Sequence, residues 1–165
     1  MRAVVADLCG ERLDPSLSAP EYHDFDVVVC GFALHHIDNV QLAVSRLVER
    51  LKPKTGVLLI IDFKPHAPIP SYHRAPHGHS HNGHHPHHGN NDIPFDGGHT
   101  VVHSGFSQEQ FKDWFEGAGL VEVEFVDVGP DGSGGKGTTL VGRDPETGGE
   151  ARIEREAFMA KGRRG

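Results

Sequence analysis

Two adjacent histidines, His35 and His36, are the residues whose type and setting point most directly to chemistry. They follow the continuous apolar run of residues 27–30 and then Gly31, which lets the backbone turn tightly. Such a run is typical of a buried parallel strand, and the loop at its carboxyl end is where open α/β sheets bind ligands. An imidazole there could act as a general base, although packing or capping the next helix is the favoured role for this pair.

A second group of histidines lies in a segment rich in glycine and proline, residues 64–105. Imidazole suits Zn²⁺, Cu²⁺ and Ni²⁺, so this density of histidines could bind a divalent metal. The spacing fixes no acidic residues behind the imidazoles. We therefore expect a long disordered loop with adventitious metal binding, and we assign no structured metal site. His99 and His103 lie outside the densest tract and could contact a substrate, although a surface-loop role is favoured for both. The histidines of the tract are His77, His79, His81, His84, His85, His87 and His88.

A strand–helix–strand unit must position the first pair of histidines. The expected strand at residues 27–30 precedes a helix that Asp38 begins, with Gln41 at its third position in a capping-box arrangement. Apolar residues recur at helical spacing until Pro53, and residues 56–62 then form a second apolar run. Because crossovers between parallel strands are right-handed in nearly all proteins, this unit predicts part of a parallel sheet.

The second half of the chain predicts one more helix and an antiparallel hairpin. Ser107 begins the helix, with Gln110 at its third position. Residues 121–125 alternate between apolar and charged, and residues 138–142 form the last expected strand, joined to them by a glycine-rich connection. That connection matches GxGxxG as a string at residues 132–137. It lies between two strands and not before a helix, so we interpret it as a hairpin loop.

The two ends of the chain are expected to add only one strand. Residues 2–7 predict a short strand, and residues 8–24 predict a loop with at most one helical turn. Residues 144–165 contain one weak amphipathic turn and are expected to form a flexible C-terminal tail, in which a few basic residues are solvated.

Composition excludes several classes of function. The chain has 165 residues, the length of a single domain. Its formal net charge of −7 disfavours nucleic-acid binding, because phosphates need clustered Lys and Arg. Cys9 and Cys30 are isolated, so neither a disulfide framework nor a cysteine metal site is indicated. No apolar run approaches the roughly 20 residues of a membrane span, and we expect a cytoplasmic protein with no membrane partner.

The sequence from Phe25 to Ile37 resembles the fourth strand and following loop of class I S-adenosylmethionine (SAM)-dependent methyltransferases of the type 11/12-like group. Residues 102–111 and 116–120 are similar to the family's approach to its last helix. The order of the elements also matches the second half of that family's fold. The resemblance covers residues 1–63 and 100–143.

The resemblance implies an α/β fold, the C-terminal portion of a Rossmann-like sheet with a final antiparallel hairpin. It places a partial methyltransferase domain at residues 1–143, interrupted by the histidine-rich loop at residues 64–105. The family's acidic, glycine-rich cofactor loop is absent before Asp7. The domain is therefore expected to be incomplete at its N-terminus, with residues 27–30 at an open sheet edge. Unless residues 2–7 pair with that edge, we expect low stability for this chain alone.

The resemblance also implies a cofactor site for SAM. Asp7 stands where the family places an acidic residue facing the adenine amino group, although an ordinary turn cap explains this aspartate equally well. Leu8 follows it in the same loop. Cys30, Gly31 and Phe32 would offer backbone groups and an apolar wall to the cofactor.

Three functions follow from these observations. The first is SAM-dependent methyl transfer to an unknown acceptor, a small molecule rather than a protein, with activity impaired or lost in this chain alone. The second is a non-catalytic methyltransferase-like fragment that binds a partner through its open sheet edge. The third is a metal-binding protein that holds Zn²⁺ or Ni²⁺ in its histidine tract.

Overall fold

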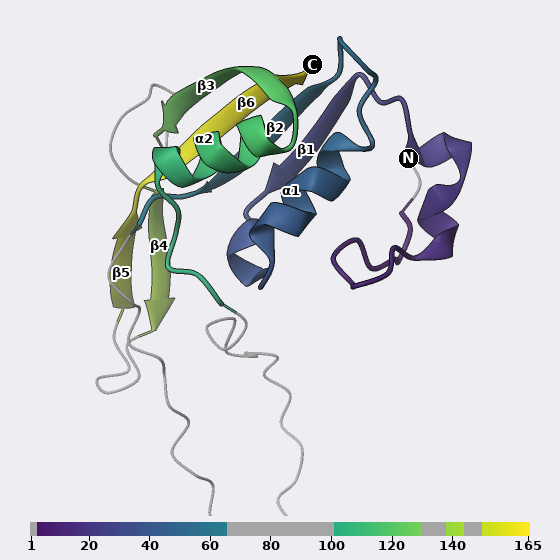
Figure 1. Ribbon diagram of the computed structural model, residues 1–165. Helices are drawn as coiled ribbons and strands as arrows, with labels where there is room; N and C mark the ends of the chain where they lie inside the picture. The colour runs from purple at the N-terminus through teal and green to yellow at the C-terminus, as the bar shows by residue number, and fades with distance from the viewer. Residues whose placement is uncertain (1–2, 66–100, 130–137, 144–149) are drawn as a thin grey trace, which may run out of the picture.

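A four-stranded sheet with the strand order β1-β2-β6-β3 forms the centre of the fold (Figure 1). The computed structural model describes residues 3–65, 101–129, 138–143 and 150–165. The strands of this sheet are β1 (Val27–Gly31), β2 (Val57–Phe63), β3 (Leu120–Val128) and β6 (Ala157–Arg164), and the helices are α1 (Val40–Val48) and α2 (Gln108–Gly117). The strands of a second, two-stranded sheet are β4 (Thr138–Arg143) and β5 (Glu150–Arg155), and the 3-10 turns are η1 (Pro15–Ser18), η2 (Pro20–Tyr22) and η3 (Leu34–His36).

The expected strand–helix–strand unit is confirmed. β1 pairs with β2 in parallel, from Val27 opposite Val57 to Gly31 opposite Ile61, and α1 connects them. The start of the helix differs by one residue from the expectation, because Asn39 and not Asp38 caps it. The side-chain oxygen of Asn39 accepts the Leu42 N–H at 3.0 Å.

The C-terminal segment is a central strand, and the expectation of a flexible tail at residues 144–165 is wrong for residues 150–165. β6 lies between β2 and β3 and is antiparallel to both, with Ile60 opposite Ala160 and Phe125 opposite Ala160 on its two sides. Phe158 and Ala160 are fully buried. The basic residues of this segment therefore belong to the sheet, where Arg163 and Lys161 form ion pairs with Glu122 and Glu124.

The final antiparallel pair is present, but its second strand differs from the expectation. β3 pairs with β6, whereas the strand expected at residues 138–142 is β4, which pairs with β5 outside the main sheet. Figure 1 shows β4 and β5 extending beyond the carboxyl end of β2. The glycine-rich residues 132–137 and most of the histidine-rich segment lie outside the described residues.

The start of the chain does not join the sheet. Residues 3–7 form no strand, contrary to the expectation, and the chain then makes the turns η1 and η2. β1 is consequently an edge strand among the described residues, paired only with β2. Of the two alternatives that the sequence left open for this edge, pairing with residues 2–7 is absent for residues 3–7.

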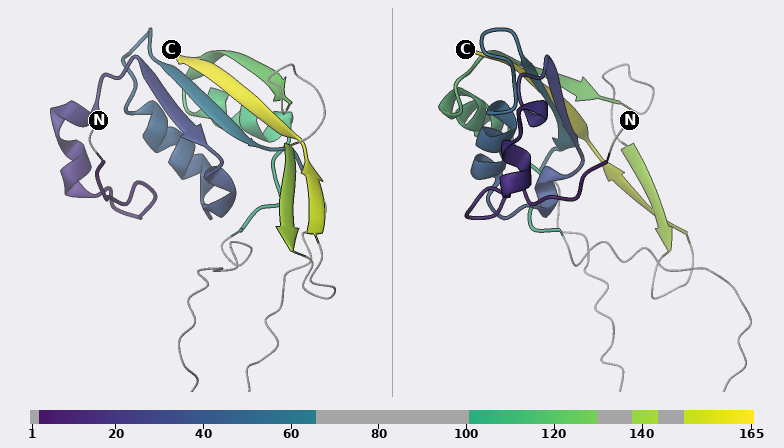
Figure 2. Two further views of the ribbon diagram at one scale, coloured as in Figure 1. Left: turned by 180° about the vertical axis from the view of Figure 1, so that it is seen from behind. Right: turned by 90° about the vertical axis from the view of Figure 1, so that its right-hand side faces the viewer.

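Both helices lie on one face of the sheet, and the opposite face carries no described helix (Figures 1 and 2). The core lies between the helices and the strands. Phe111 of α2 packs edge-to-face against Phe106, Phe115 and Phe158. At Gly162 a Cβ would lie 3.0 Å from the Phe115 ring, so glycine allows α2 to approach β6 this closely.

Ser107 caps α2 as the sequence predicts. Its hydroxyl accepts the Gln110 N–H, and the Gln110 side chain accepts the Ser107 N–H in return. Just before it, Gly105 has φ 104° and sits against the backbone of Lys64, where any Cβ would overlap a carbonyl. The Phe106 N–H donates to the Phe63 carbonyl at 2.9 Å, so the chain returns to the end of β2 directly before α2 begins.

Candidate functional site

The carboxyl end of β1 offers open backbone and an exposed ring. An ideal Cβ placed on Gly31 meets no atom within 4 Å. Phe32 follows with φ 51°, and its N–H donates to the Ile61 carbonyl at 2.8 Å, which fixes the turn. The Phe32 ring is 43% exposed and lies 5.0 Å from the Phe63 ring, centre to centre. The cofactor-facing role expected for Gly31 and Phe32 stays a prediction; the structure shows open space beside Gly31 and an exposed Phe32 ring.

Asp7 caps a turn. Its Oδ1 accepts the N–H groups of Cys9 at 2.8 Å and Gly10 at 2.9 Å, an arrangement typical of an aspartate that closes a loop. The residue is exposed, and Leu8 beside it is half-buried. Asp7 therefore caps a turn, which was one of the two roles that the sequence predicted for it.

The two cysteines bring this turn next to β1. Burial raises the pKa of the Cys30 thiol to about 11, with further contributions from the charges of Asp62 and Cys9. Burial and the Asp7 carboxylate likewise raise the pKa of Cys9. Cys9 and Cys30 both pack against the hydrophobic core, so the Asp7–Gly10 turn is held against the body of the fold. Both thiols are free and in the protonated, inert form at neutral pH.

His35 is buried and paired with a carboxylate from the end of β2. Its Nδ1–H donates to Oδ1 of Asp62 at 2.8 Å, and the Asp62 side chain is fully buried. Burial lowers the pKa of His35 and outweighs the opposite effect of the Asp62 charge, while His36 and Arg155 lower it further. The imidazole is therefore neutral at pH 7, with its proton on Nδ1 and a lone pair on Nε2.

The other two candidate histidines have different surroundings. His36 is exposed, and its ring stacks on that of His35 at 4.1 Å. His103 is half-buried, and its Nε2 bonds to the Ile37 carbonyl at 3.0 Å, which ties the segment before α2 to η3. The N–H groups of Val102 and His103 also donate to the His35 carbonyl. His35, His36 and His103 thus gather at one end of the sheet.

Two charged residues of this region were missed by sequence reasoning. Asp62 is the penultimate residue of β2, and an Asp directly after an apolar run was a signal that could have identified it. Arg155 is the last residue of β5, with its guanidinium 4.7 Å above the Phe63 ring, and it is only 6% exposed. No sequence signal points to Arg155, because the composition of residues 144–165 predicts a flexible tail.

Within the described residues, no group of three or more His, Cys, Asp or Glu could hold a metal ion. The histidine tract at residues 76–89 lies outside the described part of the chain, so metal binding there stays a prediction. Among the described helices none is long and apolar enough to cross a membrane.

Comparison with solved structures finds methyltransferases at low similarity. The YcgJ protein from Bacillus subtilis is 13% identical with a TM-score of 0.45, over 86% of this chain and 64% of that chain. Haemonchus contortus phosphoethanolamine N-methyltransferase 2, solved with S-adenosylhomocysteine, is 11% identical with a TM-score of 0.47, over 85% of this chain and 33% of that one. An O-methyltransferase family protein from Burkholderia thailandensis is 15% identical with a TM-score of 0.40, over 87% of this chain and 31% of that one.

This chain thus spans less than two thirds of each of these proteins. No family model and no curated protein sequence matches it. At such identities and TM-scores the similarities do not by themselves assign a family or an activity. The fold itself is a mixed α/β sheet with an antiparallel last strand, and its solved structural neighbours include methyltransferases.

Proposed function

We propose that this chain contributes the acceptor side of a class I SAM-dependent methyltransferase. The observation that carries the proposal is the sheet. A parallel β1–α1–β2 unit is followed by α2 and by an antiparallel β3–β6 pair, with the last strand inserted between β2 and β3. The sequence resemblance implies a final antiparallel pair, and in the structure β6 takes the place that was expected for the strand at residues 138–142. The candidate residues lie at the carboxyl end of β1 and β2, where such sheets bind ligands.

SAM would supply an electrophilic methyl group, which a lone pair of the acceptor attacks as the C–S bond breaks toward sulfur. In this chain, Gly31 and Phe32 are the residues that would border the cofactor, and Asp7 Oδ2 would accept from the adenine amino group. His35 would take the proton that the acceptor loses, because Asp62 holds the imidazole by Nδ1 and leaves Nε2 as the base. General-base catalysis of this kind contributes on the order of 10² to 10⁴ in rate.

Calorimetric titration with S-adenosylhomocysteine tests the cofactor site. A Cβ at Gly31 meets no atom within 4 Å and valine favours strands, so we expect Gly31→Val to fold, to occupy the open space beside β1 and to lose the ligand. Gly117→Ala is the matched control, because a Cβ at that position also meets nothing within 4 Å. We expect micromolar binding by the wild type and by Gly117→Ala. Absence of binding by the wild type, or binding unchanged in Gly31→Val, would overturn the proposed cofactor site.

A partner-binding role is the second proposal, and the edge of the sheet favours it. Val27 and Val29 of β1 are 52% and 60% exposed, although apolar runs of this kind are usually covered. A partner strand that pairs with β1 would cover both. In that case the chain would associate with the partner whether or not the cofactor binds.

A further inference from the structure

Two buried arginines of this protein have opposite surroundings. Arg50 and Arg155 are each 6% exposed, so both guanidinium groups have lost most of their water. A buried charge without partners is costly, and buried arginines normally find carboxylates or carbonyls. The hydrogen bonds of the two arginines therefore show which one could still bind an anion from outside the chain.

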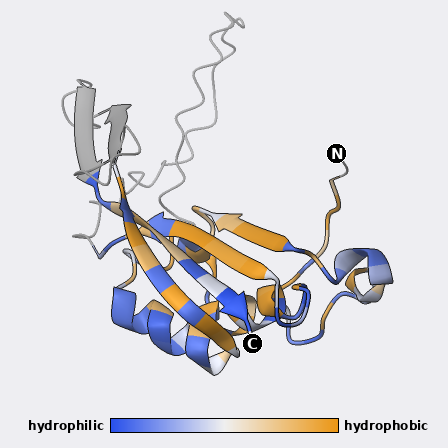
Figure 3. Ribbon diagram, turned by 90° about the horizontal axis from the view of Figure 1, so that it is seen from above, coloured by the Kyte–Doolittle hydropathy of each residue, from blue (hydrophilic) through white to orange (hydrophobic). Residues whose placement is uncertain are grey.

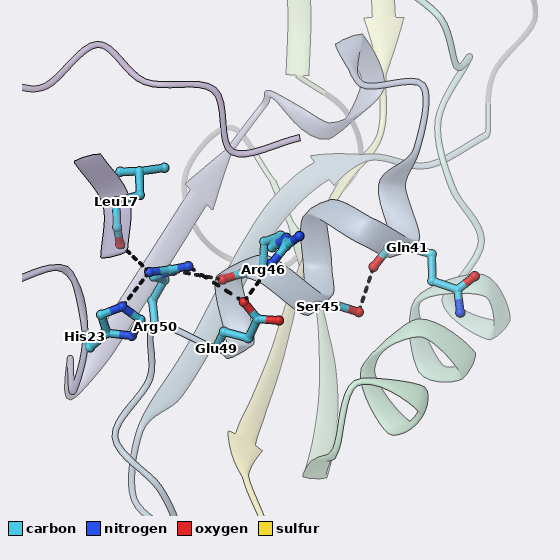
Figure 4. Close-up of polar contacts among 7 residues, drawn as sticks. All are labelled: Leu17, His23, Gln41, Ser45, Arg46, Glu49 and Arg50. Carbon is cyan, nitrogen blue, oxygen red and sulfur yellow. Dashed lines mark hydrogen bonds and ion pairs between the residues drawn. The ribbon is translucent and has the colours of Figure 1, made fainter. Parts of the chain in front are cut away.

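Arg50 is fully occupied by this chain (Figure 4). Its Nη1 donates to the Leu17 carbonyl at 2.7 Å and to His23 Nε2 at 2.8 Å, and its Nε donates to the Arg46 carbonyl at 3.4 Å. Glu49 lies 3.7 Å from its Nη2. Arg50 therefore joins the η1–η2 region to α1 and needs no ligand.

Arg155 contacts an aromatic ring but forms no ion pair with a carboxylate of the described residues. Its guanidinium lies over the Phe63 ring, and its Nε is buried without a hydrogen-bond partner among the described residues. No carboxylate of the described residues forms an ion pair with it, and burial lowers the pKa of Arg155. The aromatic face gives the cation weak electrostatic support but satisfies none of its five N–H donors.

The carboxylates nearest in the chain and in the site form no ion pair with Arg155. Glu156 follows Arg155 directly, and its carboxylate pairs with Lys64 at 3.2 Å. Lys64 also pairs with Asp127 at 2.9 Å, so this lysine has its own anions. Asp62 accepts through Oδ1 from His35 and from the Phe63 N–H, whereas its Oδ2 is buried without a hydrogen-bond partner among the described residues. Arg155 is thus the cation of this end of the sheet that lacks an anionic partner among the described residues.

Arg155 also lies close to the proposed reaction centre. The Phe63 ring centre is 4.7 Å from the guanidinium carbon and 5.3 Å from the centre of the His35 ring. Both groups therefore contact one aromatic ring, and a single small organic molecule could reach both. The planar fork of a guanidinium matches the two oxygens of a carboxylate or a phosphate, and exclusion of water strengthens that pairing.

We propose that Arg155 binds an oxyanion group, a carboxylate or a phosphate, of a small methyl acceptor. The inference rests on the proposed function and deepens it by naming the substrate class: a small anionic molecule that also carries a hydroxyl, amine or thiol near His35. Arg155 anchors the oxyanion, Phe63 forms the floor beneath it, and His35 faces the group that loses a proton. This assigns a binding role to the junction of β5 and β6.

Thermal unfolding of the full chain in different anions tests the inference without cofactor. Sodium phosphate and sodium acetate are each compared with sodium chloride at equal ionic strength, for the wild type and for Arg155→Gln, Arg155→Lys and Arg46→Gln. Arg46 is the matched control because its Nε is also buried without a partner, whereas its Nη1 has an ion pair with Glu49. An anion that binds the native state raises its melting temperature.

We expect phosphate, acetate or both to raise the melting temperature of the wild type and of Arg46→Gln. Arg155→Gln should lose that rise, and Arg155→Lys should keep part of it, which also shows that the site tolerates substitution. The more effective anion identifies the oxyanion. No difference between either anion and chloride in the wild type, or an equal rise in Arg155→Gln, overturns the inference. Anion binding together with failure to bind S-adenosylhomocysteine would reject the cofactor proposal and leave the anion site standing.

Discussion

His35 shows how burial and a charge partner oppose each other in one residue. Asp62 favours the imidazolium, but the loss of water around the ring favours the neutral form more strongly, and the net effect lowers the pKa of His35 below 6.5. A neutral imidazole that donates through Nδ1 is the form a general base requires. The same balance makes the fold sensitive to acid, because the unfolded chain binds this proton more readily than the native protein does.

The lowered pKa of His35 predicts how the free energy of unfolding depends on pH. Since the folded pKa of His35 is depressed, the stabilising contribution is complete above about pH 6.5 and is lost as the pH falls below that value. His35→Gln removes the titration, so the free-energy difference between wild type and variant should be smaller at about pH 5.5 than at about pH 7.5. Urea unfolding at the two pH values measures it.

Asp62→Asn serves as the comparison for that experiment. The amide oxygen still accepts the Nδ1–H, but the negative charge that supports the imidazolium is gone, so the acid sensitivity should become steeper than in the wild type. If His35→Gln lost the same free energy of unfolding relative to the wild type at both pH values, His35 would not titrate between them. That result would contradict the assignment of its neutral state.

At this scale the sequence located part of the site. Gly31, Phe32 and His35 were expected together because all follow one apolar run, and they do lie at one strand end. Asp62 and Arg155 were not expected there, because their proximity depends on which strands pair. Register across a sheet joins residues that are 27 to more than 90 positions apart in the chain, and no local pattern encodes that.

The strand β6 differs most from what the sequence predicts for this chain. It lies in the middle of the sheet, and its side chains alternate between two environments. Phe158 and Ala160 face the helices and are fully buried, whereas Met159 and Lys161 face the other side and are half-buried. A strand that pairs on both edges holds β2 and β3 together, so its core-facing residues should govern the stability of the whole sheet.

Adjacent substitutions in β6 test this prediction. Phe158→Ala should destabilise the chain by about 3 to 5 kcal/mol, because it opens a cavity beside Phe111 and Phe125. Met159→Ala, one residue away on the opposite face, should cost about 1 kcal/mol or less, since its side chain remains partly in water. Chemical unfolding provides both values. Similar losses of unfolding free energy in the two variants would contradict the alternation of buried and half-buried residues. Small losses in both would instead support the flexible C-terminal tail that the sequence predicted.

Local elements were predictable, and the partnership of the last strand was not. α1 and α2 have clear helical spacing and caps, and β2 is a continuous apolar run. β6 contains Lys161, Gly162, Arg163 and Arg164 within eight residues, a composition that favours solvent. The structure retains these residues in a central strand because Gly162 faces α2 closely and the basic side chains pair with glutamates of β3.

For the molecule as a whole, the two faces of the sheet are unequal. The helices cover one face, and Figure 3 shows β1 and β2 as mostly hydrophobic ribbons. On the face without described helices, the register places Val27 beside Val57, Val29 beside Leu59, and Ile61 beside Met159. The half of this face formed by β6 and β3 is instead protected by the charge pairs of Lys161 and Arg163. Val27 and Val29 of β1 are the more exposed apolar residues beside an open edge, and Val126 of β3, the other edge strand, is 49% exposed.

The backbone of β1 adds to that exposure. The Val57 N–H donates to the Asp26 carbonyl and the Phe32 N–H donates to the Ile61 carbonyl, which sets the alternation of the parallel ladder. In such a ladder, Val27, Val29 and Gly31 turn their N–H and C=O groups away from β2. The same valines thus present unpaired backbone and exposed side chains, the combination that promotes pairing with another strand.

We therefore expect concentration-dependent association of this chain through β1, measurable by analytical ultracentrifugation. A lysine at the edge opposes such pairing, so Val29→Lys should weaken association by about tenfold or more, which corresponds to roughly 1.4 kcal/mol. Val102→Lys is the matched control, because Val102 is also an exposed valine, at 49%, but lies outside every strand. Both variants add the same charge to a chain of net charge −7, so a general electrostatic effect would change both equally. Selective loss in Val29→Lys would identify β1 as the interface. Equal behaviour of the two variants, or a wild type that remains monomeric at all concentrations, would show that the open edge does not drive association.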